Sequence, residues 1–140
     1  MSHSSTIYMG STVTSEKEVI NKAGAPTTFL AGLCVHQKSD GTISLAAADG
    51  SKIGISLGRS LSSTNRTAIC TKGLGVPILL ANGFTPTLGA QVQISTTTGK
   101  AVSSGTAVNA YYRSANLAAV DEAGASISDG CALIDFPGGL

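Results

Sequence analysis

The chain has 140 residues, of which 12% are charged, and its nine basic and eight acidic side chains give a formal net charge of +1. A single domain of this length buries about 68% of its unfolded surface, so it can hold a core without disulfides or metals. The nine basic residues are scattered singly, whereas nucleic-acid binding needs a basic stripe, so we expect no nucleic-acid partner.

The surface chemistry is unusual because most polar residues are uncharged Ser, Thr and Asn. With so few charges to keep it soluble, we expect a protein partner to cover part of the surface. No apolar run approaches the 18 or so residues of a membrane helix, so we expect no membrane partner. The first 20 residues have neither the basic nor the apolar region of a secretory signal.

Three cysteines, Cys34, Cys70 and Cys131, form an odd set with wide spacing. This is not a disulfide framework and fits synthesis in a reducing cytoplasm. A zinc site made from these thiols and His36 is the alternative, but no CxxC or HxxxH spacing supports it. We therefore predict buried thiols that act as small apolar side chains, with no metal and no cofactor.

In chain order, residues 1–26 come first and differ from the rest in being rich in Ser and Thr. Ser15 and Glu18 have capping-box spacing ahead of two apolar residues, which would fit a turn of helix. We interpret residues 1–26 as an extended N-terminal arm and residues 27–140 as one β-barrel-like domain. Deletion of residues 2–24 should then leave the melting of that domain nearly unchanged.

From Thr27 onward, short apolar alternations bounded by turn residues predict strands. The predicted strands cover residues 27–37, 42–47, 52–58, 66–71, 76–81, 91–95, 107–113 and 130–136.

Turn signals separate these runs. Asp-Gly pairs at 40–41, 49–50 and 129–130 each lie between two of them, as in tight turns. Residues 114–124 have a Ser/Asn start, an apolar i, i+3 pair and a Gly end, which fits a short helix. Many short strands with regular turns predict an all-β fold, a small antiparallel β-barrel or sandwich.

The stretch 64–80 combines a β pattern, two glycines, a proline and an apolar run. We predict a bend at Gly73 and Gly75, with a positive φ at Gly73, because glycine adopts that conformation freely. Pro77 lacks a backbone N–H and predicts a sheet edge. Alternate residues of 76–79 should face the core, and whether the others face a neighbouring chain stays open.

Ser56 lies at the centre of the sequence GISLG, which matches the GxSxG nucleophile elbow of hydrolases. The elbow needs a strand that turns into a helix and a histidine after the serine. Both histidines precede Ser56, and no helical pattern follows it. We therefore interpret Ser56 as an ordinary strand residue, with a small serine hydrolase as the enzymatic alternative.

The remaining polar candidates predict no catalytic centre. Asp135 lies in an apolar strand and is interpreted as an outward-facing edge residue, with an interface ion pair or a buried functional acid as alternatives. His36 ends an amphipathic strand, where a solvated strand terminus is favoured over a base or ligand. Asp121 and Glu122 are adjacent and point apart if the segment is a helix, so they make a poor acid pair.

The order of motifs from Asp49 to Val102 resembles the small capsid decoration, or cement, proteins of tailed double-stranded-DNA bacteriophages. The resemblance is carried by GISLG, RTAICTKG, VPI, GAQV and TTTGKAV in that order, and by the ending ALIDFPGGL. It covers residues 27–140 and consists of strands and turns, not of catalytic residues.

The resemblance implies a structural virion protein that binds the outside of the assembled capsid and bridges neighbouring major capsid subunits. Its implied partners are the major capsid protein and further copies of itself, often as a trimer, and its place is the virion surface after synthesis in the host cytoplasm. In such proteins an N-terminal arm commonly adds contacts. The candidate interface residues are Ile7, Tyr8, Val19, Ile20 and Phe84.

Two other classes of binding protein remain open. A phage tail or fibre β module would share the Ser, Thr and Gly richness. A glycan-binding module is less favoured, because the chain has no Trp and only 4% aromatic residues.

Overall fold

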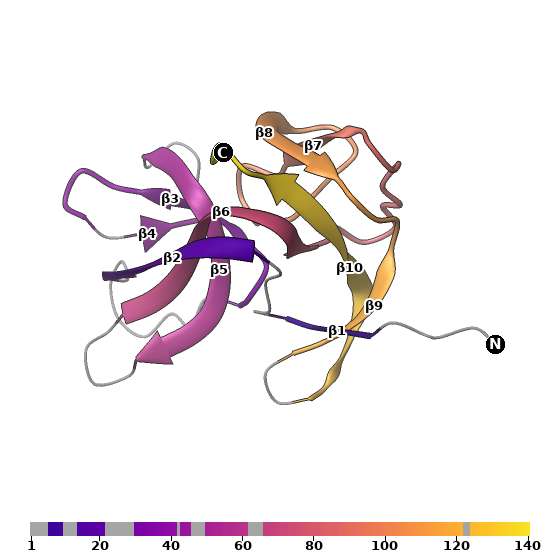
Figure 1. Cartoon of the computed structure of the whole chain (residues 1–140), viewed down its shortest axis with the longest axis horizontal. Helices are drawn as coiled ribbons and strands as arrows, with labels where there is room; N and C mark the ends of the chain where they lie inside the picture. Colours follow the sequence, from indigo (N-terminus) through magenta and orange to yellow (C-terminus); the bar gives the residue numbers. More distant parts are fainter. Residues whose placement is uncertain are drawn as a thin grey trace.

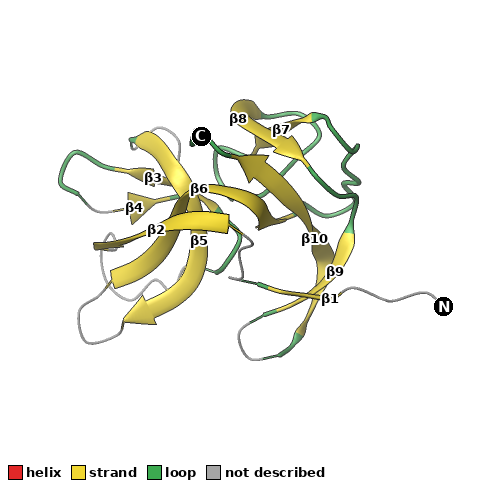
Figure 2. Ribbon diagram, viewed as in Figure 1, coloured by secondary structure: helices red, strands yellow, loops and turns green. Residues whose placement is uncertain are grey.

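The computed structural model describes residues 6–9, 14–21, 30–41, 43–45, 50–61, 66–121 and 124–140. Within them the chain forms ten strands, and Figures 1 and 2 show no helix in that part of the chain. The strands are β1 (Thr6–Tyr8), β2 (Thr14–Asn21), β3 (Cys34–Gln37), β4 (Ile43–Ser44), β5 (Ser51–Leu61), β6 (Arg66–Leu79), β7 (Gln91–Ile94), β8 (Thr106–Tyr112), β9 (Leu117–Val120) and β10 (Ser126–Phe136). No helix among these residues is long and apolar enough to cross a membrane.

All ten strands belong to one open sheet, and the predicted all-β class is confirmed. The main path runs β1-β9-β10-β6-β5-β3-β4, with β2 paired to β6 and the β7–β8 pair joined to β10 through β8. β1 and β9 are parallel, and the other strand pairs are antiparallel. The sheet curls so that side chains of β3 and β5 pack in one core cluster with those of β7 and β8, although β3, β4 and β5 appear at the left of Figure 2 and β7 and β8 at its upper right. An open sheet of this kind fits a sandwich, and a closed barrel is not confirmed.

β6 is the central strand because it has partners on both edges. Residues 66–70 pair with β5 on one edge and with β2 on the other, and residues 73–79 pair with β10. In Figure 1, β2 crosses in front of β6, and β10 follows the other half of that strand.

β2 and β10 both pair with β6, β2 along residues 66–74 and β10 along residues 73–79. Leu79 donates its N–H to Gly32, which itself donates its N–H to Ser56 of β5. Ser15 of β2 and the last residue of β10 both register with Gly73. Strand segments from the two ends of the sequence therefore both pair with the central strand.

The bend predicted at Gly73 and Gly75 is a bulge in β6. Between β10 and β6 the register passes from Ile134↔Val76 to Phe136↔Gly73, so β6 has one extra residue there. The positive φ lies at Gly75, at 64°, and not at Gly73 as the sequence predicted. The extra residue of a bulge requires a local backbone conformation that leaves the regular hydrogen-bonding pattern of the strand. Gly75 adopts that conformation, because glycine takes a positive φ freely.

Pro77 lies at a position where the sheet does not need its N–H. It registers with Leu133, whose own N–H and C=O bond to Ser114 and Arg113 instead of to β6. The pair is therefore of the non-hydrogen-bonded type, and the proline nitrogen faces away from β10.

The apolar run after Gly75 is buried within this chain. Val76, Ile78 and Leu80 belong to the main core, whereas Leu79 belongs to a second cluster on the opposite face. Pro77 is buried as well. Both faces of this segment therefore pack inside the molecule, which answers the question that the sequence left open.

Three apolar clusters hold the sheet together. The main cluster gathers side chains from β5, β6, β7, β8 and β10, with Phe136, Ile134 and Ile94 among its largest buried members. The second joins Met9, which follows β1, to Leu33, Leu79 and neighbours from β9 and β10. The third contains Val35, Ile43 and Ile69.

Three local predictions are wrong, each because a strand partner lies far away in sequence. Residues 114–124 contain β9 instead of a helix, and β9 is paired on one side with β1 and on the other with β10. The Ser15–Glu18 segment belongs to β2 and is not a helical turn. Asp129–Gly130 is a bulge inside β10, where Gly130 has φ 70° and a Cβ would lie 2.5 Å from Leu117 O.

The other predicted strands correspond to observed ones with shifted ends. The runs 66–71 and 76–81 are one continuous strand, β6. The run 27–37 is reduced to β3, since Ala31 and Gly32 form a turn, and its first three residues lie outside the described part. Asp49 and residues 46–47 also lie outside it.

Candidate functional site

Ser56 is a structural residue that holds the segment before β3. It is fully buried in β5, and its Oγ accepts the N–H of Leu33 at 3.1 Å and donates to the C=O of Leu30. Its backbone N–H donates to Leu33 O, and its C=O accepts from Gly32 N. A serine whose hydroxyl is bonded on both sides inside a strand has no nucleophile-elbow geometry.

Asp135 links the bulge in β6 to Arg113, the residue after β8. Its carboxylate accepts the N–H of Gly75 at 2.7 Å and pairs with Arg113 Nε at 2.9 Å. The side chain is 29% exposed. The predicted edge position is wrong, because β10 pairs with β8 at Asp135 and with β6 on its other edge. Both carboxylate oxygens have hydrogen-bond partners within the sheet.

The three cysteines are buried free thiols, as the sequence predicted. Cys34 and Cys70 both register with Ile55, one on each side, so about two strand spacings, or roughly 9.5 Å, separate their backbones. That distance is too long for a disulfide. Burial raises the pKa of Cys34 to about 12, although Lys52 acts in the opposite direction, and burial raises that of Cys131 to about 11.

The predicted interface residues lie in β1, in β2 and in the segment between β6 and β7. Ile7 is half-buried against the second cluster, and Phe84 packs partly on the main core with its ring 6.1 Å from that of Tyr112. Tyr8 lies in β1, opposite Val120. Val19 and Ile20 lie in β2, opposite Ala68 and Thr67.

Three exposed apolar side chains were not predicted from the sequence. Leu30 is 57% exposed, Leu88 is 67% exposed and Tyr111 is 49% exposed. Leu88 and Tyr111 belong to neighbouring segments, since Gly89 donates its N–H to Tyr112 O. Tyr111 and Tyr112 are adjacent in β8, so their side chains point to opposite faces of the strand. From this alternation the exposure of one of the two rings can be predicted.

His36 is buried, with 1% of its surface exposed, so the prediction of a solvated strand terminus is wrong. The prediction considered β3 alone and not β5, the strand that pairs with it at this position. His36 registers with Lys52 of β5 next to a bulge at Val35, and Gly50, the residue before β5, packs close to Gln37 and Lys38. Pattern analysis of β3 alone does not include this partner strand.

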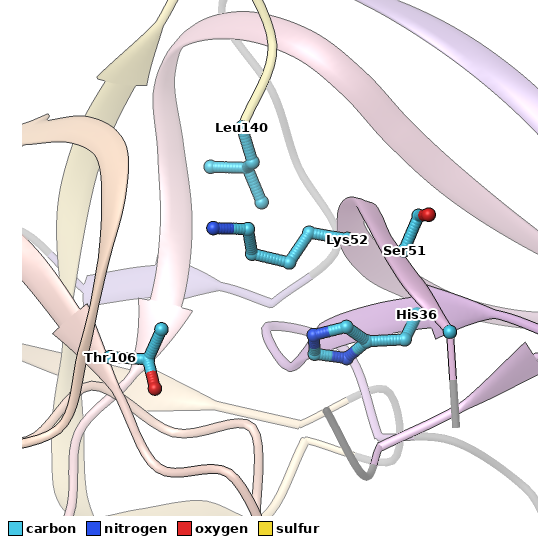
Figure 3. A pocket seen from close by; sticks show the side chains of 6 residues that line it. His36, Ser51, Lys52, Thr106 and Leu140 are labelled. Atoms are coloured by element: carbon cyan, nitrogen blue, oxygen red, sulfur yellow. The ribbon is translucent and has the colours of Figure 1, made fainter. Parts of the chain in front are cut away.

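His36 and Lys52 lie at the edge of a pocket of about 390 Å³ that is open to solvent. Figure 3 shows Lys52 extended across this pocket, with its ammonium group between Leu140 on one side and His36 and Thr106 on the other. Gly50 and Ser51 complete the lining. The pocket thus joins the β3–β5 region to the start of β8 and to the segment after β10.

The pocket has no assembled catalytic set in the described part of the chain. It contains one ammonium, one imidazole and two hydroxyls, and no acidic side chain. Likewise, no group of three or more His, Cys, Asp or Glu residues in the described ranges is placed to hold a metal ion. The arrangement suits binding of a polar group more than a reaction.

Comparisons of the chain with protein-family models, with curated proteins and with solved structures yield no match.

Proposed function

We propose that this chain is a structural protein of a tailed bacteriophage that decorates the outside of the assembled capsid and stabilises it by bridging neighbouring major capsid subunits. It acts as a homo-oligomer, with a trimer favoured, and its place is the virion surface. The proposal combines the resemblance of residues 49–102 and of the ending ALIDFPGGL to capsid decoration proteins with the chemistry of the described surface.

The observation that supports the proposal most is the open sheet, whose path ends in the short strands β1 and β4. Strand edges can bind a segment of another protein by adding it to the sheet. Leu88 and Tyr111 expose apolar surface that a protein partner would cover. Ser56 and Asp135, the two polar residues that most resembled catalytic candidates, have structural hydrogen bonds.

Decoration also fits the energetics of a shell. A protein that binds the assembled lattice and not the free coat subunit stabilises the lattice by mass action. Because many copies bind, each interface can be modest while the lattice supplies avidity. Such a role needs contact surface and low charge, and the chain has 12% charged residues.

Co-sedimentation with expanded phage capsids that lack the protein tests this function, with unassembled coat protein as the control. We expect saturable binding to shells alone, at a fixed number of copies per coat subunit. Absence of binding to shells would overturn the proposal and direct the search to tails and fibres on intact virions.

A further inference from the structure

We propose that Asn82 is a modification site, where the side-chain amide is lost spontaneously through attack by the backbone nitrogen of Gly83. This inference does not depend on the capsid function, because the reaction needs only water and the turn that contains these two residues.

The first argument is the residue that follows Asn82. It is the one asparagine in the chain that precedes a glycine. The other four precede residues with side chains, namely Lys22, Arg66, Ala110 and Leu117. Glycine has no Cβ, so its backbone nitrogen is unhindered and its backbone rotates freely. The nitrogen and the amide carbon belong to neighbouring residues, so their reaction needs no encounter between two molecules.

The second argument is the position of the pair at the tip of an exposed turn. Phe84 donates its N–H to the C=O of Ala81 at 3.1 Å, so Asn82 and Gly83 are the two central residues of the turn. Both are exposed, and a Cβ placed on Gly83 would meet nothing within 4 Å. In the described structure, no neighbouring group therefore obstructs the nitrogen of Gly83.

The third argument is that hydrogen bonds hold neither reacting group. Among the described residues, the side-chain amide of Asn82 and the N–H of Gly83 have no hydrogen-bond partner. Two other asparagines differ in this respect. Asn109 donates its side-chain N–H to Gly139 O at 3.4 Å, and Asn116 donates to Asp129 O at 3.3 Å. Their amides are held by the fold, whereas that of Asn82 can rotate toward the next nitrogen.

The reaction has two steps, and neither changes an oxidation state. In the first step a base removes the N–H proton of Gly83, the nitrogen forms a bond to Cγ of Asn82, and the bond from Cγ to Nδ2 breaks. Nδ2 takes up a proton and leaves as ammonia, and a succinimide ring remains. In the second step water opens the ring. Attack at Cγ gives aspartate, and attack at the backbone carbonyl carbon gives isoaspartate.

Both products alter the turn. Each replaces a neutral amide by a carboxylate, so the formal net charge falls from +1 to 0. Isoaspartate also inserts a carbon atom into the backbone between Ala81 and Phe84, whose hydrogen bond closes the turn. The ring of Phe84 packs on the main core, 6.1 Å from the ring of Tyr112. We expect isoaspartate to loosen this contact and aspartate to leave it unchanged.

Incubation of the full chain in weakly alkaline buffer, followed by peptide mapping with electron-transfer fragmentation, tests the proposal. We expect first-order loss of the Asn82 amide, with release of ammonia and with both aspartate and isoaspartate at this position. Asn109 and Asn116 should keep their amides in the same sample. The rate should increase in proportion to hydroxide concentration, since a base generates the attacking nitrogen.

Variants identify the nucleophile and the product. Gly83→Ala places a methyl group beside the nitrogen and should slow the loss on the order of tenfold, because intramolecular attack is sensitive to small displacements. Its φ of 75° strains alanine, so Asn82→Gln, which keeps the glycine, is the second variant and should retain its amide. Asn82→Asp carries the charge of the product without the extra backbone carbon, so it should keep the near-ultraviolet signal that isoaspartate reduces.

Three results would overturn the proposal. The first is loss of the amide at Asn109 or Asn116 before Asn82. The second is a rate in the folded chain far below that of the same chain in urea, because the turn would then protect the amide. The third is an unchanged rate in a folded Gly83→Ala variant, which would exclude the Gly83 nitrogen as the nucleophile.

Discussion

Ser56 is the polar side chain whose removal has the clearest expected cost. Ser56→Ala leaves the N–H of Leu33 and the C=O of Leu30 without their side-chain partner, at a fully buried position. We expect the free energy of unfolding to fall by about 1–3 kcal/mol in urea denaturation. Ser103→Ala, at an exposed position, is the matched control and should change it little.

The same variant tests the hydrolase alternative. Labelling of the native protein by a serine-directed probe, abolished in Ser56→Ala, would contradict the structural role of this hydroxyl. No loss of stability in Ser56→Ala would contradict it as well.

At Asp135, two interactions of different strength can be separated. Asp135→Ala removes the acceptor of the Gly75 N–H and the Arg113 ion pair together, and should lower the free energy of unfolding by about 1–2 kcal/mol. Arg113→Ala removes only the partly exposed ion pair, so we expect less than about 1 kcal/mol. Equal losses in the two variants would show that the bond to Gly75 contributes nothing.

The raised pKa values of the buried thiols predict how the free energy of unfolding changes at alkaline pH. The folded pKa of Cys34 is raised from 9.0 to about 12 and that of Cys131 to about 11, so the folded state retains protons that the unfolded state loses. The stabilisation is complete below pH about 9 and is lost progressively as the pH rises toward 11–12. Tyr112, raised from 10.0 to about 12, adds to the same slope.

Urea denaturation between pH 8 and pH 11 measures how steeply the free energy of unfolding falls with pH. The raised pKa values of Cys34 and Cys131 determine this pH range. Cys34→Ala should be less stable at pH 8 because it leaves a cavity, yet its stability should fall less steeply with pH. A slope identical to that of the native chain would contradict the raised thiol pKa.

At the scale of elements, the positive φ of Gly75 determines the bulge in β6. Gly75→Val places a β-branched residue at φ 64°, a conformation that it adopts only with strain, and should destabilise the fold by about 2 kcal/mol. Gly75→Asn should cost less, since asparagine tolerates left-handed backbone. Thermal melting of the two variants measures the difference, and equal effects would exclude backbone strain as the cause.

The first strands are expected to contribute to stability, in contrast with the expectation from composition. Met9 lies in the second core cluster at 7% exposure, and β2 pairs with β6 along its whole length. Met9→Ala should cost about 2 kcal/mol in urea denaturation, whereas Leu88→Ala, at an exposed leucine, should cost almost nothing.

Deletion of residues 2–24 removes β1 and β2 together and should lower the melting temperature. It also leaves the backbone of residues 66–72 unpaired on one edge, which favours association between copies. A truncated chain that melts like the full chain and stays monomeric would restore the interpretation of residues 1–26 as an independent arm.

Strand-level prediction succeeded where a run has its own alternation, as in 91–95 and 107–113, which became β7 and β8. It failed for β9 and β2, because their polar or mixed sequences become strands only through partners far along the chain. The same limit applies to the pocket. Its lining joins His36 to Thr106 and Leu140, and no local pattern predicts which distant segments meet.

At the scale of the whole molecule, the capsid proposal and the truncation are linked. If β2 serves only to complete the sheet, a truncated chain binds shells poorly because it is unfolded. If β2 also contacts the coat protein, folded variants with altered β2 side chains bind poorly while melting normally. Capsid co-sedimentation of Glu16→Gln and Glu18→Gln, two substitutions within β2, measures this contribution, with melting curves as the control.

The pairing of β2 with β6 has a consequence for synthesis. Glu16 registers with Lys72, roughly fifty residues later, so at about 5–20 residues per second the nascent β2 waits several seconds for its partner. β10, another partner of β6, emerges later than the other nine strands. The sheet is therefore complete only once β10 has been synthesised, and its many contacts between distant residues predict folding in milliseconds to seconds rather than microseconds.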